Sequence, residues 1–111
     1  MRRAAVALVV VALASGCGGS STPAELAVTQ STLRPGQIAL VVSNGGEEAA
    51  RIAQVILNDA FVGFRASRRG IAPGEAETIT VTYPWIRGEN YDIRLMTSSG
   101  RTVDYEIEEA A

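Results

Sequence analysis

The chain has 111 residues, of which 47% are hydrophobic and 20% are charged, so it holds enough apolar side chains for one folded domain. Ten Lys and Arg against twelve Asp and Glu give a formal net charge of -2, which excludes a strongly cationic nucleic-acid surface. With no His and one Cys, the sequence also lacks the residues of a His-dependent catalytic dyad or a His/Cys zinc site. We therefore expect no nucleic-acid partner and no catalysis of these kinds.

The first sixteen residues have the features of a secretory signal peptide. Arg2 and Arg3 supply positive charge, and residues 4–14 form an unbroken run of Ala, Val and Leu. As a helix, this run rises about 16 Å, which is half of the roughly 30 Å hydrocarbon core of a bilayer. It is too short to span a membrane but suits the apolar region of an export signal. We predict a helical signal peptide over residues 1–16 that is cleaved on export.

The end of this segment, Leu13-Ala14-Ser15-Gly16-Cys17, resembles a bacterial lipobox. The resemblance implies that the Cys17 thiol accepts a diacylglyceryl thioether. Residues 17–23 are small and mostly polar, and would then form a lipidated flexible tether. The alternative is an ordinary Ala-x-Ala type cleavage with an incidental Cys. The lipobox reading implies a lipid anchor in the cell membrane or outer membrane, with the protein on the extracytoplasmic face.

Residues 24–111 show turn signals roughly every 8 to 12 residues with β-branched segments between them, as in a sandwich or barrel. Asn44-Gly45-Gly46 is predicted to be a turn in which positive φ costs little. Residues 47–57 also fit a helical stripe, so a helix remains the alternative to a strand there. The predicted strands cover residues 25–29, 37–43, 50–57, 61–66, 78–83, 91–95 and 103–107.

Apolar and polar side chains alternate most clearly in the last three predicted strands. One apolar face and one solvated face indicate antiparallel sheets in two packed layers. The sequence therefore predicts an all-β fold, a seven-stranded antiparallel immunoglobulin/fibronectin-III-like sandwich over residues 24–111. The side chains expected in its core are those of Ile79, Val81, Ile93, Leu95, Val103 and Ile107.

Two resemblances come from the last third of the chain. Gly88-Glu89-Asn90-Tyr91-Asp92-Ile93 resembles the tyrosine corner of fibronectin type III and related sandwiches, the alternative being an ordinary amphipathic strand Tyr. Together with Ile52-Ala53-Gln54-Val55 and Asn58-Asp59-Ala60, the string from Tyr83-Pro84-Trp85 through Gly88, Tyr91 and Gly100 is similar to small immunoglobulin-like extracytoplasmic domains. Such domains occur beside the membrane portion of ZIP-type metal transporters and in archaeal pilin-like surface proteins.

This second resemblance covers roughly residues 50 to 108. It implies how these residues pack in the fold and does not imply a catalytic or binding activity. Transporter-linked relatives often carry His where this chain has Tyr105. The resemblance therefore implies a link to metal uptake at most, and not transport itself.

Acidic side chains are candidates for a hard cation such as Ca²⁺. Glu75 and Glu77 share one strand face, and a C-terminal stretch contains Asp104, Glu106, Glu108 and Glu109. No Asp-rich calcium loop accompanies them, and such faces are usually solvated. We predict no metal site and no cofactor.

Arg65, Arg68 and Arg69 cluster around a predicted loop and could meet anionic lipid headgroups or polyanionic wall polymers. A merely solvated turn is the interpretation we favour. Trp85 could anchor a partner, because Trp is a frequent hot-spot residue, or could plug the end of the sandwich, which we prefer.

These observations predict a lipid-anchored, non-catalytic binding or scaffolding module at the cell surface. Its expected partners are the membrane, through the lipid, and an envelope protein that contacts the exposed sheet edges. The alternative function is an accessory domain associated with ZIP-type divalent-metal transport. A small carbohydrate-active or peptide-processing enzyme is a third hypothesis, which we do not favour.

Overall fold

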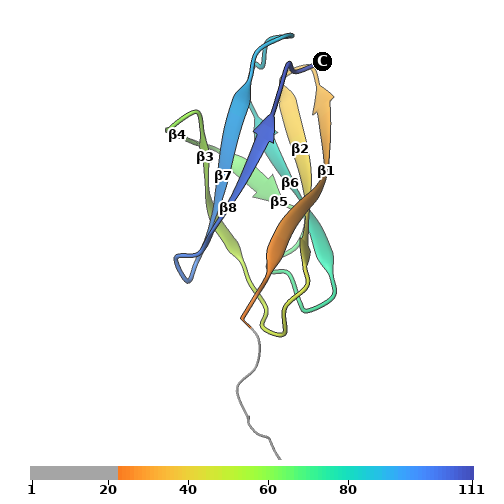
Figure 1. Cartoon of the computed structure of the whole chain (residues 1–111), viewed down its shortest axis with the longest axis vertical. Helices are drawn as coiled ribbons and strands as arrows, with labels where there is room; N and C mark the ends of the chain where they lie inside the picture. Colours follow the sequence, from red (N-terminus) through yellow and green to blue (C-terminus); the bar gives the residue numbers. More distant parts are fainter. Residues whose placement is uncertain (1–22) are drawn as a thin grey trace, which may run out of the picture.

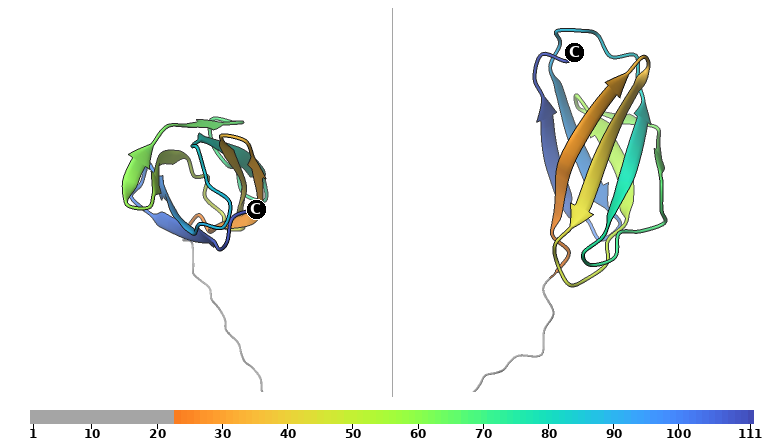
Figure 2. Two further views of the ribbon diagram at one scale, coloured as in Figure 1. Left: turned by 90° about the horizontal axis from the view of Figure 1, so that it is seen from above. Right: turned by 90° about the vertical axis from the view of Figure 1, so that its right-hand side faces the viewer.

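The computed structural model describes residues 23–111, which form two antiparallel β-sheets packed face to face (Figures 1 and 2). The predicted signal peptide and most of the predicted tether, including Cys17, lie outside the described residues. Residues 23–111 include no helix with the length and hydropathy of a membrane span. The strands are β1 (Leu26–Arg34), β2 (Gln37–Asn44), β3 (Ile52–Leu57), β4 (Ala60–Val62), β5 (Phe64–Ala66), β6 (Ala76–Thr82), β7 (Tyr91–Thr97) and β8 (Thr102–Ile107).

One sheet has the strand order β1-β2-β6-β5 and the other has the order β4-β3-β7-β8. This is the order of immunoglobulin-type sandwiches, with β4 as an additional edge strand. The all-β, two-layer prediction is therefore confirmed. The described chain begins at one end of the sandwich, and the C-terminus lies at the other end (Figure 1).

The prediction of seven strands is wrong, because the segment predicted as one strand over 61–66 forms two. β4 pairs with β3 in one sheet, whereas β5 pairs with β6 in the other. The chain changes sheets at Gly63, between the two strands. Val62 and Phe64, on either side of the change, both pack against the core, one from each sheet. A run of apolar residues that faces the core from both layers looks like a single strand in the sequence.

The core is made by alternating residues of the central strands. Five of the six predicted core residues are buried, whereas Val103 is only partly buried and packs against the core's edge. The strands β2 and β3 contribute further buried side chains, namely Ile38, Leu40, Val42, Ile52, Val55 and Leu57.

Two β-bulges interrupt the alternation. The register of β1 on β2 shifts between Val28 and Gln30, and that of β3 on β7 shifts between Ile52 and Gln54. One extra residue in a strand moves the following side chains to the other face. In β3 the next buried position after Ile52 is therefore Val55. The helical alternative for residues 47–57 is wrong, because residues 52–57 form a strand. Only one residue of the predicted helical stripe (Ala49, Ile52, Ala53 and Ile56) is buried, namely Ile52.

Asn44, the last residue of β2, ties together the end of the sandwich where the described chain begins. Its side chain is 1% exposed and makes four hydrogen bonds. Oδ1 accepts from the backbone N–H groups of Glu25 (3.2 Å) and Gly46 (2.9 Å). Nδ2 donates to the backbone oxygens of Glu48 (2.7 Å) and Ile71 (3.0 Å). Asn44 thus fixes the start of β1 to the loops that follow β2 and β5.

Gly46 belongs to the same cluster, but for a different reason from the predicted one. Neither Gly45 nor Gly46 has a positive φ, so the interpretation of this turn is wrong. A Cβ on Gly46 would lie 2.0 Å from the carbonyl oxygen of Pro23 and 2.7 Å from the nitrogen of Glu25. Glycine is required here because the first described residues cross directly over the loop.

Candidate functional site

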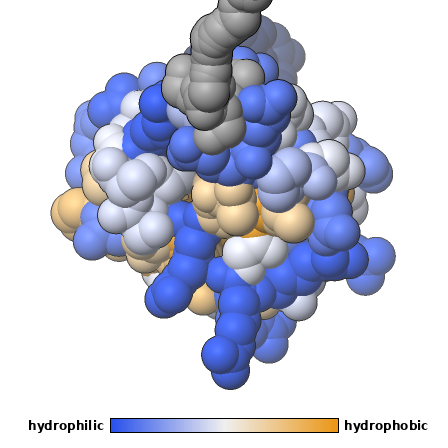
Figure 3. All heavy atoms as spheres, turned by 90° about the horizontal axis from the view of Figure 1, so that it is seen from below, coloured by the Kyte–Doolittle hydropathy of each residue, from blue (hydrophilic) through white to orange (hydrophobic). Residues whose placement is uncertain are grey.

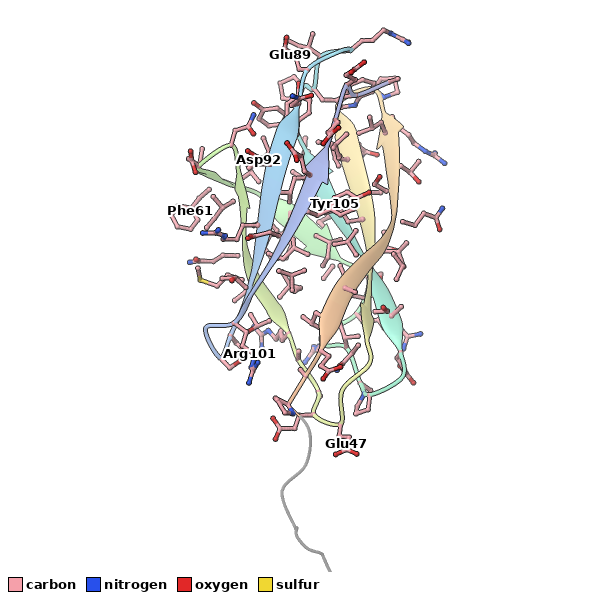
Figure 4. All side chains as sticks on the ribbon, in the orientation of Figure 1. Glu47, Phe61, Glu89, Asp92, Arg101 and Tyr105 are labelled. Atoms are coloured by element: carbon pink, nitrogen blue, oxygen red, sulfur yellow. The ribbon has the colours of Figure 1, made fainter. Side chains whose placement is uncertain are left out.

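Tyr83, Trp85 and Tyr91 make contacts around the loop between β6 and β7. This loop contains Glu89 and lies at the end of the sandwich opposite the start of the described chain (Figure 4). The rings of Tyr83 and Tyr91 meet edge to face, with centroids 5.7 Å apart and an interplanar angle of 75°. The buried Tyr91 accepts a hydrogen bond at its hydroxyl from the backbone N–H of Ile86 at 2.6 Å. This is the contact that a tyrosine corner makes.

Trp85 closes the same end. Its Nε1 donates to the carbonyl oxygen of Arg34 at 2.6 Å, and the half-buried indole packs against the core. Gly88, with φ at +88°, turns the chain back toward β7, and its N–H donates to the carbonyl oxygen of Ala110. Pro84 is exposed. Tyr83, Trp85 and Tyr91 therefore make packing contacts at this end of the sandwich.

The acidic residues of β7 and β8 lie on the outer face of their sheet, where Figure 4 labels Asp92. Arg94 binds Asp104 through two nitrogens, at 2.7 and 3.2 Å, and this contact lowers the pKa of the Asp104 carboxyl. Asp92 lies directly opposite Glu106, and the repulsion between them raises the pKa of Glu106. Among residues 23–111, no three His, Cys, Asp or Glu side chains form a group that could hold a metal ion.

Tyr105, at the position where the transporter-linked domains often have His, faces the other way. Its hydroxyl lies 3.0 Å from Oγ of Ser31 and is hydrogen-bonded to it. The contact joins β8 to β1 across the edges of the two sheets. Tyr105 thus helps to close this side of the sandwich.

A pocket of about 420 Å³ opens on the opposite side, between β3 and β5. It exists because β4 pairs with β3 only from Val55 to Leu57, so no strand covers the first half of β3. Three arginines line it: Arg51, just before β3, and Arg68 and Arg69, just after β5. Arg68 and Arg69, which the sequence analysis grouped with Arg65, therefore line the same pocket as Arg51, which it did not include.

The same pocket is lined by Glu77, whose side chain was expected to be solvated together with Glu75. That expectation is wrong, because Glu77 is 3% exposed. Its place two residues before Ile79 and four before Val81 puts it on the core face of β6. Glu75, in contrast, is exposed and forms an ion pair with Arg68 (Nη1 to Oε1, 2.5 Å). The strand phase was visible in the sequence and would have placed Glu77 inward.

Glu77 is incompletely satisfied. The backbone N–H of Arg68 hydrogen-bonds its carboxylate, but Oε1 has no hydrogen-bond partner among the described residues. Burial raises the pKa of the Glu77 carboxyl, and the contacts with Arg68 oppose this shift. A buried carboxylate oxygen without a partner is costly and rare in folded proteins.

The described surface also carries two exposed large apolar side chains at separate places, Phe61 (70% exposed) and Ile86 (63% exposed). Phe61 lies on β4, the three-residue edge strand, and points away from the sandwich (Figure 4). Ile86 belongs to the loop between β6 and β7. Phe61 therefore combines an exposed ring with an unpaired strand edge, which are two features of protein-binding surfaces.

No protein-family model and no curated protein matches the sequence. Solved structures do match. The archaellum periplasmic stator protein FlaG from Sulfolobus acidocaldarius is 20% identical, with a TM-score of 0.69, over 76% of this chain and 99% of the FlaG chain. A chain of the FlaF and FlaG stator complex from the same organism is 19% identical, with a TM-score of 0.66, over 74% of this chain and 87% of its own. At these identities the likeness shows a shared fold, and it agrees with the expected similarity to archaeal surface proteins.

Proposed function

We propose that this chain is a non-catalytic scaffolding domain of the cell envelope, held at the membrane by a lipid on Cys17 and bound to a protein partner. The observation that carries the proposal is the fold match, because the described sandwich corresponds to nearly the whole of a periplasmic stator protein. The second matching structure is of a complex between FlaF and FlaG, which supports a protein partner for this chain also.

The lipid is supported by the lipobox-like sequence and by the character of the adjoining end of the domain. Seen from the end where the described chain begins, the visible surface is mainly hydrophilic, with smaller apolar areas near its centre and at its left side (Figure 3). Such a surface offers little apolar area for insertion into a bilayer. Membrane affinity would then come from acyl chains on Cys17 and not from the sandwich. The ZIP-type alternative has no contact in residues 23–111 that favours it.

The partner surface we propose is the free edge of β4 around Phe61. An unpaired strand edge can accept a strand from another chain, and the exposed aromatic ring can fill an apolar pocket on it. Natural edge strands are usually protected by charge or covered. The middle residue of β4, Phe61, is instead 70% exposed. An exposed aromatic ring at this position is expected if a partner protein covers the edge of β4.

The anchor is tested by separating membrane and soluble fractions of cells that make the native chain or Cys17→Ala. We expect the native chain in the membrane fraction and the variant in the soluble extracytoplasmic fraction. A variant that remains in the membrane fraction would show that the lipid is not the attachment.

The partner surface is tested with a photo-reactive residue at Ala60, beside Phe61 on β4, and with the same residue at Arg101, toward the opposite end of the domain (Figure 4), as a control. Illumination of intact cells should give one discrete cross-linked product from position 60, and adding Phe61→Ser should remove it. Equal products from both positions, or a product that survives Phe61→Ser, would refute this surface.

A further inference from the structure

The outward-facing residues of the β4-β3-β7-β8 sheet carry an inference about the chemistry of the partner, and this inference rests on the β4 surface proposed above. Phe61 on β4 lies opposite Ile56 on β3. Ile56 also lies opposite Arg94 on β7, which in turn lies opposite Asp104 on β8. Opposite residues of neighbouring strands point to the same side of a sheet. The exposed ring of Phe61 therefore shares one face with the charged side chains of β7 and β8.

This face contains a hollow of about 380 Å³, which begins at Ile56, next to Phe61. Four carboxylates and one guanidinium group line the hollow, so its lining carries a net charge of -3. The charged lining residues are Asp59, Asp92, Arg94, Asp104 and Glu106. An apolar strand edge and an acidic hollow thus lie side by side on the same sheet.

The negative charge of the hollow is only partly balanced within residues 23–111. Arg94 is bound to Asp104 through two nitrogens. Asp92 and Glu106 lie directly opposite each other on β7 and β8, and neither takes part in the two ion pairs of the described residues. Like charges at opposite positions of two strands destabilise a sheet. A cationic side chain from another molecule would remove this repulsion.

The charge of this face also distinguishes between possible occupants of the β4 edge. Two copies of the chain that paired through β4 would join their sheets and bring two acidic hollows close together, which is unfavourable. An anionic lipid surface would be repelled for the same reason. A protein with a basic surface is attracted, because complementary charge speeds association and selects the partner.

We propose that the partner of the β4 edge is a protein with a basic face, which receives the Phe61 ring in an apolar pocket and places a Lys or Arg side chain between Asp92 and Glu106. Neighbouring strands lie about 4.8 Å apart, so a contact that starts at β4 and ends between β7 and β8 spans about 12 Å. A standard interface of about 800 Å² on each partner is wider than this. One partner domain can therefore cover both features.

The test measures the photo-cross-link from position 60 of the full chain in intact cells, in two variants matched for net charge. The first variant combines Asp92→Lys with Glu106→Lys and reverses the charge inside the hollow. The control combines Glu25→Lys with Glu89→Lys, at exposed positions near the two ends of the sandwich. We expect the yield of the product to fall at least about tenfold in the first variant, because like charges then meet, and to stay at the native level in the control.

A second variant guards against a loss of folding. Asp92→Asn with Glu106→Gln removes the repulsion, so it should not lower the melting temperature of the purified protein, and it should still reduce the yield. A lower melting temperature would contradict the repulsion from which the proposal is argued.

The outcomes separate this inference from the proposed function. A product from the native chain that is unchanged in the charge-reversed variant, or that falls equally in the control, overturns the basic partner and leaves the β4 surface standing. A product with the mass of two copies of this chain also overturns it. Absence of any product from position 60 in the native chain refutes the β4 surface itself, and this inference with it.

Discussion

Replacing Asn44 with Ala tests how the start of the sandwich is held. The native side chain satisfies two N–H donors and two carbonyl oxygens that belong to three separate segments of the chain. Alanine supplies none of these contacts. The N–H of Gly46 is buried and loses its partner, whereas that of Glu25 is only partly buried and can turn to water.

The expected loss follows from these four bonds. A typical intramolecular hydrogen bond contributes about 1 kcal/mol, and a buried group left unpaired costs about 1–3 kcal/mol. Allowing for water at Glu25, we expect Asn44→Ala to lower the free energy of unfolding by about 3 kcal/mol. In a domain of this size, that corresponds to a fall in melting temperature of roughly 15–20 °C.

Urea unfolding followed by circular dichroism measures this loss, with Asn90→Ala as the matched control. The Asn90 side chain accepts one hydrogen bond, from the N–H of Glu109, at an exposed position of the opposite end. Its removal should cost less than about 1 kcal/mol. If the two variants unfold at the same urea concentration, Asn44 does not hold the end of the sandwich and this reasoning is refuted.

Three further outcomes follow from contacts described above. Gly46→Ala should destabilise the fold by more than about 2 kcal/mol in thermal unfolding, because its Cβ would lie 2.0 Å from the Pro23 carbonyl oxygen, and a neutral effect would contradict the close approach. Tyr91→Phe should cost about 1 kcal/mol, since the N–H of Ile86 loses its acceptor while the ring contact remains, and an unchanged urea midpoint would argue against that bond. Because burial raises the pKa of Glu77, the folded state binds its proton more tightly than the unfolded state, so stability should fall as the pH rises above about 4.5. In Glu77→Gln this part of the pH dependence should flatten, and an identical pH profile would show that the carboxyl is not desolvated.

Much of the sandwich could be predicted from the sequence because its central strands obey strict alternation. Ile79 and Val81, and then Ile93 and Leu95, fall on one face by their spacing alone, and all four are buried. The strand predicted over residues 50–57 is present as β3 despite its bulge. The single strand predicted over residues 61–66 is wrong, because the chain changes sheets at Gly63.

The features of the candidate pocket were harder to foresee for a different reason. Arg51 precedes β3 and Arg69 follows β5, and these strands belong to different sheets. The two arginines line one pocket because the sheets pack against each other, which no local sequence pattern predicts. Glu77, however, had the same strand phase as the core residues beside it, and its charge alone suggested a solvated face. The part played by Asn44 depends on loops that no periodicity describes.

The proposed envelope function depends on attachment of the domain to the membrane through a lipid on Cys17. The most direct test is mass spectrometry of the N-terminal peptide of the protein purified from cell membranes. We predict that this peptide begins at Cys17 and carries the added mass of a diacylglyceryl thioether. A peptide that begins elsewhere, or a Cys17 with a free thiol, would contradict the proposed anchor and the function built on it.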